Sequence, residues 1–362
     1  MFKTRKQILL LCIFLTFNSC KKKAEQVILN NVSLSTGFNK SAELRKGLLL
    51  ISNRAGCTMC ERFEIDIMRG GEYAESIFSK FIIQRADQNV NGSKWLSRVL
   101  NSGGFPVYLF FDDSKKLMAI EVGAMPEKRM EFILNKLENH KPWIDPNFKL
   151  GSIKKSDDVI QYIENLMKAQ YQWEKFNETK SVVALNGIEQ KLIKTNDIQS
   201  SFYNNYLLAK YYAVKKDTLL MHKFAQVALK VDDMNSQFLN AGLRPELKML
   251  VYKNYNLYDD PYLGIENVNK NLGKLKFGSK NNISFPIKNL GKQDLVIKNV
   301  FTDCACTVSE FTKANLAPGK TGSINIKFNA KDIGEFTHLI YVQSNSINAP
   351  LTLNIQGTVV AD

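Results

Sequence analysis

The feature that most constrains the fold is a pair of cysteines between a buried strand and a helix. Residues 47–52 (GLLLIS) form a continuous apolar run, which is typical of a strand buried on both faces. Cys57 and Cys60 follow shortly after it, and helical spacing of apolar residues continues over 61–69. Cysteines three positions apart on the first turn of a helix lie on one face, close enough to form a disulfide. We therefore expect a thiol pair at a helix start, directly after a buried strand.

The residues after this pair predict more strands and helices in alternation. We expect strands at 81–86, 107–111 and 116–122, and helices at 93–100 and 126–139. An X-Pro step, Phe105-Pro106, leads into the strand at 107–111, and Asp112-Asp113-Ser114 supplies the turn to the next strand. The order of strand, C-x-x-C, helix, parallel strand, helix, X-Pro and β-hairpin resembles the thioredoxin family.

This resemblance implies a thioredoxin-like α/β domain over residues 41–145. Cys57 and Cys60 match the family's redox pair, and no cofactor is expected. Cys57 would be the nucleophile, since a helix N-terminus stabilises a thiolate, and Cys60 would resolve the mixed disulfide. Pro106 matches the cis-proline that faces the pair, and together with Phe105 it would position the substrate.

Two positions depart from the family pattern. Gly56 stands where a Trp usually precedes the first cysteine, and Ile51 stands where thioredoxins place a buried carboxylate. A structural disulfide or half of a zinc site are the alternatives for the pair. The sequence has no second C-x-x-C, and its three histidines, His140, His222 and His338, are far apart along the chain. We therefore expect no metal site at this pair.

The N-terminus is typical of an export signal, with a basic start and a short apolar run at 8–17. The run is shorter than the ~20 residues that span a bilayer. Phe17-Asn18-Ser19-Cys20 resembles the lipobox of bacterial lipoproteins. The resemblance implies a signal peptide at 1–19, a lipidated Cys20 and a polar tether at 20–40. The alternative is a plain signal peptide with an incidental Cys20.

The charge of the chain agrees with a membrane surface as its partner. The excess of Lys and Arg over Asp and Glu gives the chain a formal net charge of +14. Three of these lysines, Lys21, Lys22 and Lys23, directly follow Cys20 and would lie beside the lipid headgroups. No nucleic-acid motif accompanies the charge, so we expect no nucleic-acid partner. The acidic residues linked to surface export are absent after Cys20. We therefore expect the cell envelope of a Gram-negative bacterium, with the chain lipid-anchored and facing the periplasm.

Residues 150–260 predict an all-α middle segment. Helical patterns cover 159–176, 181–194, 200–214, 219–231 and 244–257. The stretch 203–233 loosely resembles one tetratricopeptide-like helical pair. We expect a helical spacer.

Residues 265–362 predict an all-β domain. Short alternating strands at 283–288, 295–300, 322–328, 336–343 and 351–359 are typical of a β-sandwich. Motif residues in this segment resemble the DUF1573 family of Ig-like domains; they are Asn289-Leu290-Gly291, Asp303-Cys304-Ala305-Cys306-Thr307, Leu316-Ala317-Pro318-Gly319 and Ser344-Asn345. The whole chain is thus expected to be multidomain.

Cys304 and Cys306 form a second thiol pair. On a strand they would lie about 6.6 Å apart, at the long edge of disulfide geometry. Such a pair could exchange with a partner, hold Cu(I), or be structural or idle. The leading hypothesis is a periplasmic thiol–disulfide oxidoreductase with protein thiol or disulfide clients and a membrane electron donor. The alternative is a non-enzymatic binding or scaffold lipoprotein, or a Cu(I) carrier through Cys304 and Cys306.

Overall fold

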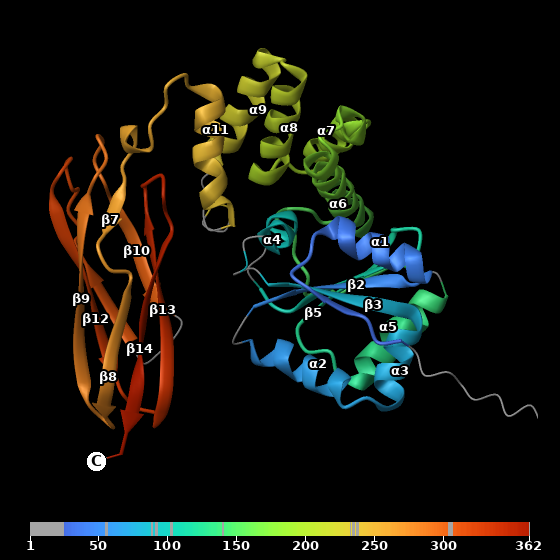
Figure 1. Ribbon diagram of the computed structural model, residues 1–362, viewed down its shortest axis with the longest axis horizontal. Coiled ribbons are helices and arrows are strands. Elements are labelled where there is room, and N and C mark those ends of the chain that lie inside the picture. Colours follow the sequence, from blue (N-terminus) through green and yellow to red (C-terminus); the bar gives the residue numbers. More distant parts are fainter. Residues whose placement is uncertain are drawn as a thin grey trace, which may run out of the picture.

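The computed structural model describes residues 25–361 except for a few short gaps, and it comprises an α/β domain, a helical segment and a C-terminal β-sandwich (Figure 1). The gaps are 55–56, 88–89, 91–92, 102–103, 140, 232, 234–235, 237–238 and 303–306. The predicted signal peptide and lipidated Cys20 therefore lie outside the described residues, as do Cys304 and Cys306. Within the described ranges, no helix combines the length and apolar character needed to cross a bilayer.

Six strands form the sheet of the α/β domain in the order β1-β3-β2-β4-β5-β6. The β1, β3 and β2 strands are parallel, and β4 and β5 each run antiparallel to the strand before them in this order. The strands are β1 (Ile28–Asn30), β2 (Gly47–Asn53), β3 (Phe81–Asp87), β4 (Val107–Phe111), β5 (Leu117–Val122) and β6 (Trp143–Ile144). The predicted strands of this segment are confirmed, whereas β1 and β6 were not expected.

Helices cover both faces of this sheet. On one face lie α2 (Thr58–Met68), α3 (Gly71–Lys80) and α5 (Glu127–Glu138); on the other lie α1 (Leu34–Leu44) and α4 (Lys94–Leu100). Alternate residues of β2 face the two cores, Leu48 with one and Leu49 with the other. Burial on both faces is why this strand is apolar throughout.

The expectation of a tether over residues 20–40 is wrong in its second half, because β1 and α1 lie there. Ser33 begins α1 as its N-cap and accepts a hydrogen bond from the Thr36 amide. Leu34 and Phe38 are buried one helical turn apart against the sheet. So few apolar residues produce only a weak helical pattern, yet they suffice once a sheet face is available to cover them.

The helical segment packs on the same sheet face as α1 and α4. Its elements are α6 (Ser156–Thr179), η2 (Val182–Leu185), α7 (Ile188–Ile198), α8 (Phe202–Lys215), α9 (Thr218–Lys230), η3 (Ala241–Leu243), α11 (Arg244–Val251) and η4 (Leu257–Asp259). Side chains of α6, such as Tyr162 and Leu166, belong to one continuous core with Leu50 and Leu109 of the sheet. The α8 and α9 helices pack against each other, as the pattern at 203–233 predicts.

The C-terminal domain is a sandwich of two four-stranded sheets, β10-β13-β14-β8 and β11-β12-β9-β7. Its strands are β7 (Leu263–Ile265), β8 (Asn269–Lys276), β9 (Lys280–Asn289), β10 (Ile297–Thr302), β11 (Thr307–Phe311), β12 (Thr321–Asn329), β13 (Gly334–Ser344) and β14 (Leu351–Val360). In β9, Ile283, Phe285 and Ile287 point inward while the residues between them are exposed. The predicted strands are confirmed, and β7, β8 and β11 add to them.

Candidate active site

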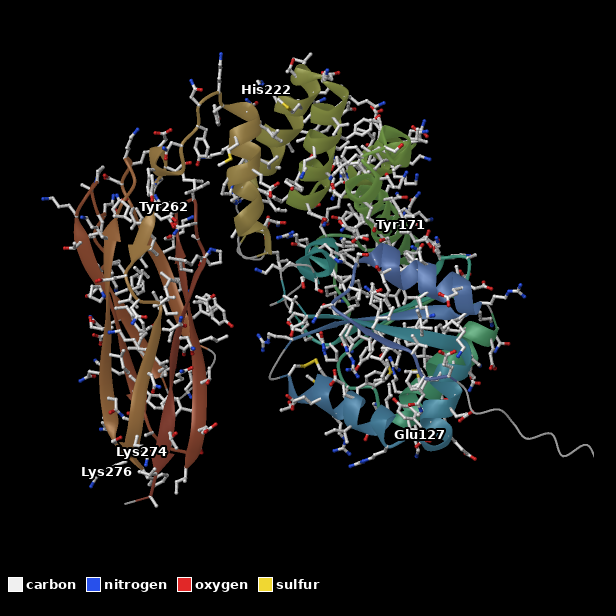
Figure 2. All side chains as sticks on the ribbon, viewed as in Figure 1. Glu127, Tyr171, His222, Tyr262, Lys274 and Lys276 are labelled. Atoms are coloured by element: carbon white, nitrogen blue, oxygen red, sulfur yellow. A yellow bond between two sulfur atoms is a disulfide. The ribbon has the colours of Figure 1, made fainter. Side chains whose placement is uncertain are left out.

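Cys57 and Cys60 lie at the start of helix α2 and form a disulfide. Figure 2 shows it as a yellow bond at the end of the α/β domain that faces the β-sandwich. Cys57 is the N-cap of α2, and its Sγ accepts a hydrogen bond from the Cys60 amide at 3.2 Å. The two residues are 8% and 5% exposed. The first turn of the helix thus directs the Cys60 N–H at the Cys57 sulfur, where it and the helix dipole would stabilise a thiolate.

Phe105 and Pro106 lie at the same end of the sheet as the disulfide. Ser52 of β2 pairs with Val107 of β4, so the step before Val107 adjoins the carboxyl end of β2 that leads to Cys57. The Phe105–Pro106 peptide bond is cis. The Pro106 carbonyl accepts a hydrogen bond from Gly123, whereas the Phe105 main chain makes none within the described part of the chain. The Arg54 guanidinium lies over the Phe105 ring, 5.7 Å from its centroid.

One row of residues across the sheet holds polar groups that the sequence patterns did not identify. Ile51 pairs with Tyr108 of β4, which pairs in turn with Glu121 of β5. All three are buried, and Tyr108 contacts Phe63 of α2 edge to face. The β2 position of this row is therefore apolar, but a buried carboxylate lies two strands away on β5. The one signal in the sequence for a buried Glu121 is that this single acid of strand 116–122 falls at an inward-facing position of the strand.

Glu121 is held in a satisfied hydrogen-bond network. One carboxylate oxygen accepts from Arg129 and the other from the Trp143 indole at 2.7 Å. Arg129 also contacts Asp145 at 3.2 Å. Burial and the neighbouring Asp145 raise the pKa of Glu121 to about 7. This network joins α5, β5 and β6. Tyr108 beside it has a buried hydroxyl without a hydrogen-bond partner among the described residues, and burial raises its phenol pKa.

Metal ligands do not gather in the described ranges. No group of three His, Cys, Asp or Glu side chains there is arranged to hold an ion. The disulfide occupies both sulfurs of the first pair. The thiol pair Cys304 and Cys306 follows β10 and precedes β11 in the sequence, outside the described residues.

Comparison with known families gives a match for the C-terminal domain. Residues 263–359 match the family described as "Protein of unknown function (DUF1573)". The match covers the strands β7 to β14 almost completely and leaves the α/β domain and the helical segment unassigned. Among curated proteins, none matches the chain.

Several solved structures are similar to parts of the chain. A protein of unknown function from Porphyromonas gingivalis W83 is 13% identical, with a TM-score of 0.26, and covers 29% of this chain; this chain spans half the length of that one. A thioredoxin-fold protein from Helicobacter pylori is 18% identical, with a TM-score of 0.25, over 36% of this chain and 87% of that chain. A chain in a complex of ferredoxin:thioredoxin reductase and thioredoxin f2 is 14% identical, with a TM-score of 0.26, over 31% of this chain and 96% of that chain.

Proposed function

We propose that this chain is a membrane-anchored periplasmic thiol–disulfide oxidoreductase that acts on protein disulfides through Cys57 and Cys60. The observation that carries the proposal is the disulfide across the first turn of α2, with its first sulfur at the helix N-terminus. The cis Phe105–Pro106 step at the same end of the sheet supports it. The strand order and directions of the sheet further support a thioredoxin-like fold for this domain, and the DUF1573 match supports an Ig-like fold for the sandwich.

The chemistry is two successive thiol–disulfide exchanges. In the reduced protein, the Cys57 thiolate attacks one sulfur of a client disulfide, forms a mixed disulfide and releases the first client thiolate. The Cys60 thiolate then attacks the Cys57 sulfur, which closes the intramolecular disulfide and releases the second client thiolate. Two electrons pass to the client, and a membrane-bound dithiol would then supply two electrons that reduce the Cys57–Cys60 disulfide again. The same steps in reverse oxidise a client dithiol.

The Phe105 main chain is suited to hold the client. Its N–H and C=O have no partner among the described residues and lie before Pro106, which itself has no N–H, so an extended client segment can pair with this edge. The half-buried Phe105 ring and the Met59 side chain, which is 46% exposed between the cysteines, supply apolar surface at the same end. A segment of unfolded protein around a disulfide offers the free main-chain groups and the exposed apolar side chains that this surface would bind.

A trapping experiment tests the proposal. The Cys60→Ala variant should accumulate mixed disulfides with clients, because the resolving thiol is gone, whereas Cys57→Ala should trap none. A cross-link from Cys57 to Cys304 or Cys306 in the Cys60→Ala chain would identify exchange between the two thiol pairs. A Cys60→Ala chain without mixed disulfides, together with a reduction potential below about −300 mV, would instead show a structural disulfide.

The second candidate function is a non-enzymatic envelope lipoprotein that binds a partner or carries Cu(I) through Cys304 and Cys306. The observation in its favour is the buried, apolar Ile51, which stands where the thioredoxin resemblance expects the carboxylate that takes a proton from the second cysteine. Copper titration of the chain with Cys57→Ser and Cys60→Ser isolates the second pair. Copper binding that persists after Cys304→Ser and Cys306→Ser would exclude it as the copper site.

A further inference from the structure

Arg54 lies at the disulfide end of the α/β domain, and the two exchange steps proposed above do not use it. It directly follows β2, and its carbonyl oxygen accepts a hydrogen bond from the Cys57 amide at 3.2 Å. Its guanidinium lies over the Phe105 ring, 5.7 Å from the centroid. Arg54 is thus joined through its main chain to the turn that presents Cys57 and through its side chain to Phe105. These are the two residues that a client would contact.

The positive charge of Arg54 has no counterion in the protein. A guanidinium stays protonated at every pH at which proteins fold. Among the described residues, no carboxylate forms an ion pair with Arg54. The short gaps in the loops at this end of the sheet contain no Asp or Glu in the sequence; they are 55–56, 88–89, 91–92 and 102–103. Arg54 is therefore available to an anionic group of a client.

The neighbouring charges on α2 differ from Arg54 in this respect. Arg62, five positions after Cys57, already forms an ion pair with Asp66. Glu61 is the acid in the first turn of α2, and it is exposed to solvent. Arg54 alone combines a free positive charge with a fixed position beside Phe105.

The contact with the Phe105 ring determines how the guanidinium can bind an anion. The cation–π attraction holds one face of the guanidinium against the ring. Its N–H donors lie in the guanidinium plane, so a ring on one face leaves them open. Their forked arrangement matches the two oxygens of a carboxylate, and such a pair forms two parallel charge-assisted hydrogen bonds.

The Phe105 main chain determines where that carboxylate has to lie in the client. A client segment that pairs with Phe105 is extended, and each residue advances it by about 3.3 Å. A residue one or two positions from the client cysteine is therefore only about 3–7 Å further along the segment. Its side chain passes close to the Phe105 ring and to the guanidinium that lies on it.

We propose that Arg54 makes this site selective for clients that carry an Asp or Glu one or two positions from the disulfide cysteine. This inference rests on the thiol–disulfide exchange proposed above and specifies the class of its clients. The guanidinium binds the client carboxylate and so aligns the client sulfur with the Cys57 thiolate. No bond to Arg54 forms or breaks during the exchange.

Exchange with three model clients tests the proposal. Each is the same short peptide, in which the single cysteine forms a disulfide with 2-thiopyridine and the next residue is Asp, Asn or Lys. The Cys57 thiolate attacks the peptide sulfur and releases pyridine-2-thione, the better leaving group, whose absorbance gives the rate. Only the redox pair should react, so the full chain carries four further substitutions: Cys12→Ser, Cys20→Ser, Cys304→Ser and Cys306→Ser.

The Asp peptide should react about tenfold faster than the Asn peptide, which corresponds to about 1.4 kcal/mol. The same ratio measured with dithiothreitol corrects for the reactivity of the peptides themselves. Arg54→Gln should abolish the preference, Arg54→Glu should reverse it in favour of the Lys peptide, and Arg54→Lys should retain part of it. The matched control is Arg69→Gln, which removes the same charge at the far end of α2 and should leave the ratio unchanged.

The ratio of rates separates recognition of the client from other effects of the substitution. A smaller thiolate fraction of Cys57, or a partial loss of folded protein, slows all three peptides by the same factor and leaves the ratio as it was. Equal corrected rates for the three peptides, or a preference that persists in Arg54→Gln, would overturn the inference while the redox function stands. Absence of exchange with every peptide would instead refute the redox function, and the inference with it.

Discussion

Reduction of the Cys57–Cys60 disulfide should leave the α/β domain folded. A redox-active pair has to pass through its dithiol form in every cycle, so the fold must tolerate both forms. A structural disulfide, by contrast, commonly contributes about 2–5 kcal/mol, and its loss often prevents folding. A loss of unfolding free energy on reduction that is much larger than the closure of this short loop supplies would therefore indicate a structural disulfide.

The structure limits the size of the effect. The two cysteines are three positions apart, so the disulfide closes a very short loop, and chain entropy gives it about 2 kcal/mol at 25 °C. In the reduced form the Cys57 sulfur remains at the N-cap of α2, where the helix dipole stabilises a thiolate by about 0.3–1 kcal/mol. We therefore expect reduction to lower the free energy of unfolding by less than about 2 kcal/mol, equivalent to about 40 mV in reduction potential.

Tryptophan fluorescence during urea unfolding measures this difference in the right part of the molecule. Trp95, Trp143 and Trp173 all lie in the α/β domain and the α6 helix that shares its core, and the β-sandwich has no tryptophan. The oxidised and dithiothreitol-reduced chains are compared, and the Cys57→Ser, Cys60→Ser chain is the control that reductant should not change. A loss above about 4 kcal/mol on reduction would refute the redox interpretation.

Three substitutions test other parts of the structure. The pKa of Glu121 in the folded chain is about 7, above its ordinary 4.5, so the free energy of unfolding should fall by up to about 3 kcal/mol as the pH rises from 5 to 8. Glu121→Gln should remove this fall, as measured by urea unfolding at each pH. A pH profile that the substitution leaves unchanged would contradict the assignment. Tyr108→Phe removes a buried hydroxyl that has no hydrogen-bond partner among the described residues, so the variant's unfolding free energy should be equal or about 1 kcal/mol higher. A clear loss of stability would show that the hydroxyl has a partner. Gly291→Ala would place a Cβ 1.9 Å from the Asp260 carbonyl oxygen and should destabilise the sandwich by about 3 kcal/mol in thermal unfolding. The control is Gly242→Ala, because a Cβ at that position meets open space. Equal melting temperatures of the two variants would refute the predicted clash.

Strong periodic patterns predicted most of the fold. The apolar run at 47–52 and the alternation in 283–288 each specify how many faces of a strand are buried, and the structure agrees with both. Helix α1 was missed because Leu34 and Phe38 become a hydrophobic face only when the sheet lies against them. The gain from that contact depends on tertiary packing, which no local pattern contains.

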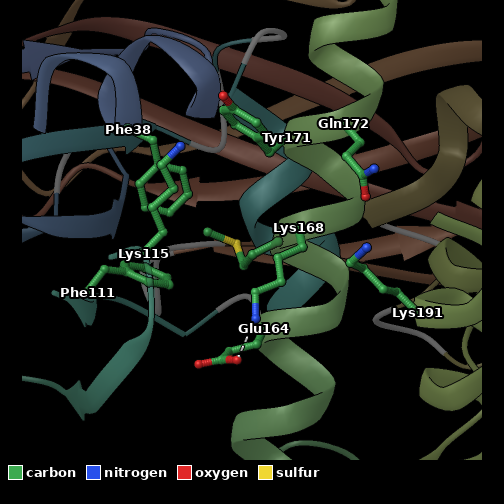
Figure 3. A pocket seen from close by; sticks show the side chains of 9 residues that line it. Phe38, Phe111, Lys115, Glu164, Lys168, Tyr171, Gln172 and Lys191 are labelled. Carbon is green, nitrogen blue, oxygen red and sulfur yellow. Dashed lines mark hydrogen bonds and ion pairs between the residues drawn. The ribbon is translucent and has the colours of Figure 1, made fainter. Parts of the chain in front are cut away.

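The candidate site was predictable where chemistry depends on local spacing. Cys57 and Cys60 meet because three residues nearly complete one helical turn, so their spacing alone predicts that they lie close enough for a disulfide. The row from Ile51 through Tyr108 to Glu121 depends on the register of three strands, and the cavity lined by Phe38 and Tyr171 (Figure 3) depends on how α6 packs on α1. Long-range register and packing are the quantities that a single sequence specifies least directly.

The shared core also changes how the helical segment is understood. Tyr162 and Leu166 of α6 pack in the same core as Leu50 of β2, so the predicted boundary after residue 145 cuts through a hydrophobic core. Hydrogen bonds cross the boundary as well, since Glu164 of α6 accepts the Leu117 amide. The segment thus covers the sheet face opposite α2, which leaves the disulfide end of the sheet uncovered by α6.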